Sequence, residues 1–293
     1  MHQFLNAIGF KNIQKQEELD SILQSIVSSP TRHMTAIDSE GNEFAEFVKE
    51  YGDSIGIMVR GKFLDDDTFR IEYYVPYLLG EGITSEEQIE VQKHSEKESY
   101  AGICDEVRLG VTLIFYLQNV AEYLNEDHMA PISKGRETIT LTGLSVNGKI
   151  ILPISKNEKQ KKNTKKSTQN RNYLIAAARE GDEEAIESLT LEDMDTYSML
   201  SRRIAFEDVL SIVDTSFMPY GIESDQYSVI GEILDYRLVK NEMTKEEIYI
   251  MKIDTNSMIF DICINKKDLM GEPQIGRRFK GSIWIQGRIN YVN

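Results

Sequence analysis

Cysteine is scarce in this sequence of 293 residues, which contains only Cys104 and Cys263. The two lie far apart with no Cys-x-x-Cys pair, so their spacing is that of neither a zinc site nor a redox dithiol. We expect two buried free thiols, as in proteins from a reducing compartment. Histidine pairs at metal-binding spacing, a Walker-type loop and a Gly-x-Gly-x-x-Gly fingerprint are also missing, so we expect no metal, nucleotide or other cofactor.

Long apolar runs are missing as well. The longest is Val111–Leu117, which Thr112 interrupts, whereas a membrane-spanning helix needs about 20 apolar residues. The first residues, Met1 to Lys11, lack the basic start and the apolar stretch of a secretory signal. We therefore expect a cytoplasmic, soluble protein with no membrane partner.

Positive charge is outnumbered, because 33 Lys and Arg residues stand against 48 Asp and Glu residues, for a net charge of −15. A hydrophobic content of 41% and a charged content of 28% are those of an ordinary globular protein. The acidity excludes a protein whose whole surface binds nucleic acid or an anionic membrane, since both are polyanions.

The charge is unevenly distributed along the chain. Residues 156–171 contain seven basic side chains, one acidic side chain (Glu158) and no apolar residue. Such a segment cannot bury surface, so we interpret it as a basic low-complexity linker between domains 1–155 and 172–293. The alternative is that this segment is a docking site for an acidic partner or nucleic acid.

Hydrophobic periodicity in the first block predicts an antiparallel sheet with a covering helix. Helical spacing predicts a helix over 12–29, and alternation predicts strands over 55–63 and 69–79, joined by a hairpin turn at Asp65–Asp67. A further buried strand is expected over 110–117.

Asn147-Gly148 is the clearest hairpin signal of the chain, because this dipeptide favours the tight turn between two antiparallel strands. It predicts strands over 138–144 and 149–154 on either side of the turn. With the helix and strands above, it places the first block in the α+β class.

The second block begins with a helical segment and ends in strands. We expect helices over 173–189 and 191–203, the second capped by Thr190. Short strands then follow one another, which predicts a small β-barrel-like domain. The strands are expected over residues 209–217, 227–239, 247–253, 258–264 and 279–289.

The last of these strands interleaves cations with aromatic side chains, a pattern that can hold phosphates and stack bases of single-stranded nucleic acid. The alternative is that the aromatic residues Phe279 and Trp284 belong to the core, in which case no stacking surface exists. The candidate binding residues are Arg277, Arg278, Lys280, Trp284 and Arg288.

Several short motifs near both ends of the chain carry a resemblance. They include Ala7-Ile8-Gly9-Phe10, Phe217-Met218-Pro219-Tyr220-Gly221 and Gly276-Arg277-Arg278-Phe279-Lys280-Gly281, followed by Trp284-Ile285-Gln286-Gly287. On these motifs the chain resembles a family of uncharacterised proteins from anaerobic Gram-positive bacteria. The resemblance spans the chain and implies a domain of unknown function, with no catalytic or binding residues to carry over.

The missing signatures favour a non-enzymatic binding or interaction protein, whose partner is a protein or a small molecule, or a second copy through an exposed strand edge. Contact with single-stranded nucleic acid through the C-terminal strands is one alternative. Another is a hydrolase, because 48 acidic residues make a pair of converging carboxylates easy to assemble. No catalytic or metal-binding residue is singled out by the sequence.

Overall fold

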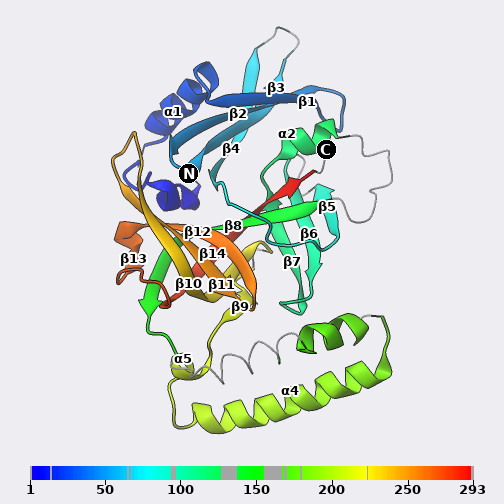
Figure 1. Ribbon diagram of the computed structural model, residues 1–293. Coiled ribbons are helices and arrows are strands. Elements are labelled where there is room, and N and C mark those ends of the chain that lie inside the picture. Colours follow the sequence, from blue (N-terminus) through cyan, green and yellow to red (C-terminus); the bar gives the residue numbers. More distant parts are fainter. Residues whose placement is uncertain are drawn as a thin grey trace.

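Two β-sheets share the centre of the molecule in the computed structural model, and helices lie at its periphery (Figure 1). The structure describes residues 2–13, 15–64, 66, 68–93, 97–126, 137–154, 167, 170–178, 180–222 and 224–291. The expected α+β class is confirmed.

The first sheet is the predicted antiparallel one, with strand order β1-β2-β3-β4. Alternating apolar residues form its strands, and the predicted β3–β4 hairpin is confirmed. Helix α1 (Gln16–Ser28) begins with Glu17 and Glu18, where the helix dipole favours carboxylates, and it packs its apolar face on β2 and β3. The strands are β1 (Arg32–Ile37), β2 (Glu43–Gly52), β3 (Ile55–Phe63) and β4 (Phe69–Leu78).

The second sheet closes on itself as a five-stranded barrel. Its ring runs β8-β12-β11-β10-β14 and returns to β8, because β14 pairs with both β10 and β8. Side chains such as Phe279 and Ile262 form the apolar core of this sheet. The ring strands are β8 (Thr138–Ile151), β10 (Gln226–Lys240), β11 (Glu247–Thr255), β12 (Met258–Asn265) and β14 (Arg278–Asn290).

The barrel corrects the predicted C-terminal domain in one strand. Residues 209–217, expected as a strand, form helix α5 (Val209–Ile212) and the short strand β9 (Ser216–Pro219), which pairs with β10 at the side of the ring. Asp208 caps α5 through its carboxylate, which accepts from the Leu210 amide. The fifth barrel strand is β8, from the block before the predicted linker, so strands from 1–155 and 172–293 share one sheet. Most of residues 156–171 lies outside the described residues.

The hairpin predicted at Asn147-Gly148 is wrong, because β8 continues straight through both residues. The register against β14 slips by one residue at Val146, so a bulge lies just before the dipeptide. Glycine is required for another reason: a Cβ at position 148 would lie 2.4 Å from the Phe279 ring. Glycine therefore occupies position 148 because β8 and β14 approach each other closely there, and not because the chain turns.

The remaining strands extend the barrel sheet, and β7 (Val111–Leu117) joins it beside β14 in the predicted position. Beyond β7 lie β6 (Tyr100–Glu106) and β5 (Ile89–Lys93), and the two-residue β13 (Leu269–Met270) pairs with β8. Three short helices complete the sheets: η1 (Gln3–Ile8) near the N-terminus, α2 (Val120–Asn125) after β7 and η2 (Lys266–Asp268) after β12.

A second core joins the barrel to the first sheet. The N-terminal residues Phe4 and Ile8 pack there between α1, the strands β3 and β4, and outward-facing barrel residues such as Trp284. The predicted helix over 12–29 is thus confirmed as a covering element. The two cysteines are buried free thiols, as predicted. Among the described helices none is long and apolar enough to cross a membrane.

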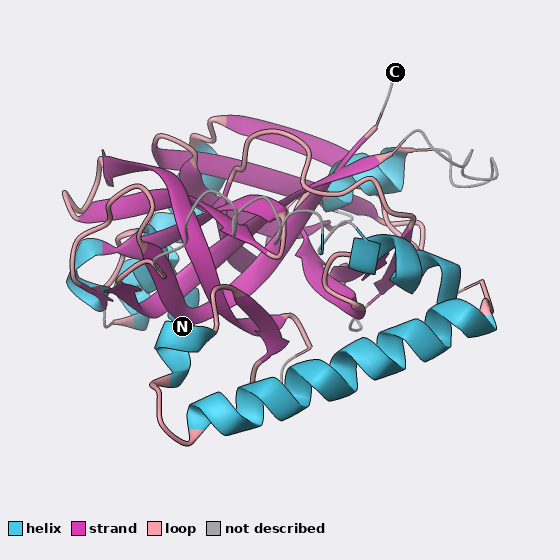
Figure 2. Ribbon diagram, turned by 60° about the horizontal axis from the view of Figure 1, so that its bottom comes forward, coloured by secondary structure: helices cyan, strands magenta, loops and turns pink. Residues whose placement is uncertain are grey.

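The helical segment leaves the sheets and forms an arm, defined here as residues 170–212. Residues 170–178 are helical, and α4 (Glu183–Ile204) returns alongside them (Figures 1 and 2). The break between them lies at Gly181, with φ of 90°, and Asp182, whose carboxylate accepts from two amides at the start of α4. Thr190 lies inside α4 and donates to the Ile186 carbonyl, so the predicted cap at Thr190 is wrong.

Candidate functional site

The aromatic residues of the predicted nucleic-acid surface are covered. Trp284 is 5% exposed and stacks on Phe4 with ring centroids 5.2 Å apart, while its Nε1 donates to Asp225 at 2.7 Å. Phe279 is fully buried in the barrel. Base stacking needs an open aromatic face, so Trp284 and Phe279 provide no stacking surface and their pattern gives no support to contact with single-stranded nucleic acid.

Arg278 is buried and serves the fold. Its guanidinium donates to the carbonyl oxygens of Leu152 and Leu210 at 2.7 Å, and to that of Val213 at 2.6 Å. Burial lowers the pKa of Arg278, since these acceptors are neutral. Leu152 precedes the arm and Val213 follows it, so one side chain holds both ends of the excursion that carries the helices.

The other candidate cations are dispersed. Arg277 and Lys280 are half-buried near the start of β14. Arg288 lies ten residues beyond Arg278 on the same strand, which corresponds to roughly 33 Å, and it forms a 2.9 Å ion pair with Glu122. The five predicted residues therefore do not form one surface.

Arg288 borders a cavity of about 90 Å³ between the two sheets, large enough for a few water molecules. Behind it lies Arg60, a fully buried arginine that the strand pattern gave no means to single out. Its Nε donates to Glu46 at 2.7 Å and its Nη1 donates to the Tyr116 hydroxyl at 2.7 Å. Burial alone disfavours the charge, but Tyr116 and Glu46 outweigh it and raise the pKa of Arg60. At this cavity Arg288 pairs with Glu122, and Glu46 pairs with Arg60.

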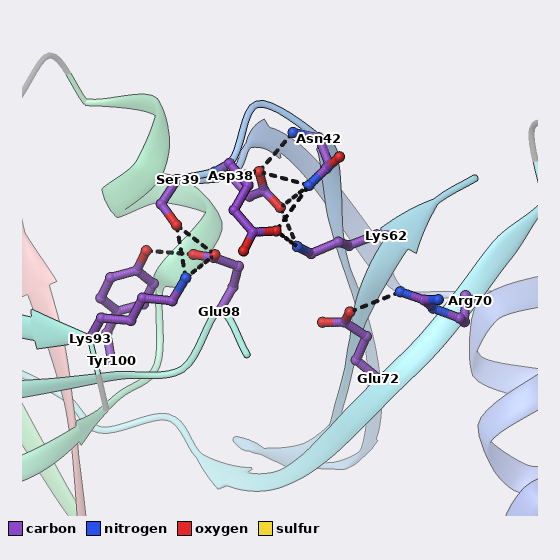
Figure 3. A network of polar contacts seen from close by, with 10 residues as sticks. Asp38, Ser39, Asn42, Lys62, Arg70, Glu72, Lys93, Glu98 and Tyr100 are labelled. Atoms are coloured by element: carbon purple, nitrogen blue, oxygen red, sulfur yellow. Dashed lines mark hydrogen bonds and ion pairs between the residues drawn. The ribbon is translucent and has the colours of Figure 1, made fainter. Parts of the chain in front are cut away.

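A second polar network joins the first sheet to β5 and β6 (Figure 3). Glu98 accepts from Lys93 at 2.6 Å, from the Tyr100 hydroxyl at 2.5 Å and from Ser39 at 2.9 Å. Burial opposes ionisation of Glu98, but these donors outweigh it and lower its pKa. The Glu98 carboxylate thus links the first sheet to β5 and β6 through hydrogen bonds and an ion pair.

Asp38 has a similar environment in the same network, where Lys62 lies 2.5 Å away and the Asn42 amide donates at 2.7 Å. Burial disfavours its charge, but Lys62 and Asn42 lower its pKa to about 2. A general acid at neutral pH needs a raised pKa. Hydrogen bonds and nearby cations also lower the pKa of Glu98, Glu106 and Glu247, so these carboxyl groups give no support to the hydrolase alternative.

The described residues contain no cluster of three or more histidine, cysteine or acidic side chains arranged for a metal ion. Burial raises the pKa of both thiols, to about 12 for Cys104. A thiol in such surroundings is unreactive as a nucleophile at neutral pH.

The arm is the most exposed apolar surface among the described residues. Among the described side chains of α4, Ala185 is the only buried apolar one, and Tyr197 is 75% exposed. Of the 24 large exposed apolar side chains of the described residues, nine lie in the arm. On α4 they are Ile186, Leu191, Met194, Tyr197, Met199 and Ile204.

One face of α4 gathers three of these residues. Ile186, Tyr197 and Ile204 are separated by eleven and seven residues, close to three and two helical turns, so they lie in one line along the helix. Leu191 and Met199 lie on the opposite side. Arg171, from the helix that precedes α4, bonds Asp193 at 2.7 Å and holds the two helices together.

The sequence marks the region around the arm by its high content of acidic residues. Residues 173–225 carry 3 basic and 13 acidic side chains, the most acidic stretch of the second block. The apolar residues of α4 were predicted to be helical, but periodicity gives only the face of a helix and does not identify what covers it. Their exposure became evident only from the arrangement of the arm and the sheets.

No curated protein and no solved structure matches the chain. One family model matches residues 5–287, nearly the whole length, and its description reads "Domain of unknown function, E. rectale Gene description". The chain therefore belongs to this family, DUF3881.

Proposed function

We propose that this protein is a non-enzymatic interaction protein, and that its arm binds a basic amphipathic helix of a partner protein. The observation that carries the proposal is the line of Ile186, Tyr197 and Ile204 along α4, all of which are exposed. Exposed apolar side chains aligned on one helix face are anchor points typical of interaction sites, and Asp193 lies between Ile186 and Tyr197 on this face. A helix with such a line pairs with an apolar partner helix.

The charge of the arm defines the partner. The arm contains ten acidic and four basic side chains, which give it a charge of −6. A second copy of the arm would bring like charges together, at an energetic cost. A partner with lysine and arginine beside its apolar stripe would gain attraction instead, as well as a faster encounter.

The side chains of the arm suit such a partner. Met194 is flexible and polarisable, which lets a surface adapt to different apolar shapes. Tyr197 offers a large ring with a hydroxyl group, a combination enriched at protein interfaces. The hydrogen bond from Arg278 to the Leu210 carbonyl and the bond between Arg171 and Asp193 hold the arm in position.

A designed peptide tests the proposal. An 18-residue helix with leucines on one face and lysines on the other is labelled with fluorescein, and binding is followed by fluorescence anisotropy. We expect I186S/Y197S to weaken binding at least tenfold. The matched control L191S/M199S, which changes the opposite side of α4, retains it. All four side chains are exposed, so neither variant disturbs the core.

Two results would overturn the proposal. One is equal binding of the peptide by both double variants, which would show that the apolar line plays no part. The other is a dimer in sedimentation velocity that I186S/Y197S dissociates, which would make a second copy the occupant. A peptide with glutamate in place of lysine must bind more weakly than the basic one.

A further inference from the structure

A groove of about 490 Å³ lies at the end of the barrel next to the N-terminal segment. Four lysines line it, although the chain as a whole has a net charge of −15. They come from the end of β10, from the β10–β11 turn and from η2. The full lining is Asn12, Lys240, Thr244, Lys245, Glu246, Glu247, Lys266 and Lys267.

The wall of the groove is a rigid turn. The buried Asn241 side chain accepts from the amides of Met243 and Thr244 at 2.9 Å, and it donates to the Ile8 carbonyl at 2.8 Å. Thr244 donates through its hydroxyl to the Gly9 carbonyl at 2.6 Å. The turn is thereby fixed to the N-terminal segment, so its lysines project from a preorganised backbone.

The floor of the groove is a buried carboxylate with three donors. Glu246 accepts from Asn12 at 2.8 Å, from Asn265 at 2.6 Å and from Lys267 at 3.0 Å. These donors satisfy Glu246 and hold Lys267 in place. The carboxylate therefore acts as a support for the cations around it.

The lysines exceed the carboxylates. Lys266 pairs with Glu247 at 2.7 Å, but both side chains are more than 40% exposed, and such surface pairs contribute little and rearrange readily. Lys240 and Lys245 form no ion pair with any described carboxylate. Four lysines against two glutamates leave the groove with a charge of +2.

We propose that this groove binds a small molecule that carries a phosphoryl group with at least two negative charges. Lysine is a common phosphate ligand, acting as a point charge. The volume falls in the range of small-molecule sites. No aromatic side chain lines the groove, so recognition by base stacking is not favoured and the phosphoryl group supplies the binding energy. This proposal is independent of the arm and its partner.

Isothermal titration calorimetry at low ionic strength, with inorganic pyrophosphate as the probe, tests the inference. We expect K240Q/K245Q to weaken binding at least tenfold, while R70Q/K97Q, which removes two exposed cations outside the groove, leaves it unchanged. Both pairs remove the same charge, so a general electrostatic effect would lower both equally. Circular dichroism confirms that each variant is folded.

Three outcomes would overturn the proposal. The first is the absence of binding to the wild-type protein, and the second is equal weakening by both double variants. The third is binding of citrate as tight as that of pyrophosphate, which would make carboxylates the ligand class. Increasing salt must weaken the pyrophosphate complex, because the lysines are exposed.

Discussion

Arg278 and Leu152 are joined by two hydrogen bonds, in which Nε and Nη2 of the guanidinium donate to one carbonyl oxygen at 3.0 and 2.7 Å. The same Nη2 also donates to the Leu210 carbonyl at 2.7 Å. Leu152, which precedes the arm in the sequence, and Leu210, near the end of the arm, are therefore held next to each other. A single arginine in the barrel wall fixes the origin of the arm.

We expect R278Q to destabilise the protein by about 2–3 kcal/mol, because the partly buried carbonyl groups of Leu152, Leu210 and Val213 lose their donors. Urea unfolding followed by circular dichroism measures the free energy of unfolding. R277Q, which changes the half-buried neighbour, is the control and should cost less than about 0.5 kcal/mol. If R278Q lowers the free energy of unfolding no more than R277Q does, the hydrogen bonds of Arg278 do not stabilise the protein as we expect.

Gly148→Ala tests why glycine follows Asn147. The new Cβ would lie 2.4 Å from Cε2 of Phe279, and such overpacking costs about 1–3 kcal/mol. Thermal unfolding of G148A, F279L and the double variant forms a cycle. If the clash is the cause, G148A costs less in the F279L background than in the wild type. Additive effects would contradict this explanation.

Asp38 predicts a pH dependence of stability. Its pKa of about 2 in the folded protein lies below the value of about 3.9 in an unfolded chain. The unfolded state thus binds the proton first, so the stabilisation is present above pH 4 and is lost as the pH falls towards 2. The shift corresponds to roughly 2 kcal/mol.

Asp38→Asn removes this contribution. We expect the difference in unfolding free energy between wild type and D38N to be largest near pH 6 and to shrink towards pH 2, where the wild-type carboxyl is also neutral. Urea titrations at several pH values measure it. A difference that is independent of pH would mean that the ion pair with Lys62 does not cause the effect.

Sequence periodicity predicted the local elements well and their pairing less well. The helix over 12–29 and the hairpin of β3 and β4 depend on patterns within a few residues, and both were found. The closure of the barrel by β8 depends on pairing with β14, about 140 residues away, and no local pattern specifies that. Asn147-Gly148 misled because a glycine needed for close approach looks the same in sequence as a glycine needed for a turn.

The candidate sites show the same limit. Arg278 and Trp284 were singled out for their residue types, but burial decides what such residues do, and burial depends on tertiary contacts. The lysine groove combines Asn12 with residues 240–267, which are brought together only by the fold. Its lysines are spread along the sequence between acidic residues, so no charge run marked them.

Removal of the arm separates the two proposals. The carbonyl groups of Leu152 and Leu210 bond the same nitrogen of Arg278, so a short Gly-Ser linker in place of residues 156–206 can join the ends of the excursion. We expect this deletion variant to unfold cooperatively with a Tm close to that of the wild type, because the barrel core contains no residue from α4. It should lose binding of the basic peptide and retain binding of pyrophosphate.

Calorimetry and anisotropy measure the Tm and the binding of the two ligands. A marked fall in Tm would show that the arm contributes to the stability of the barrel. Loss of pyrophosphate binding in a folded deletion variant would contradict the independence of the groove from the arm.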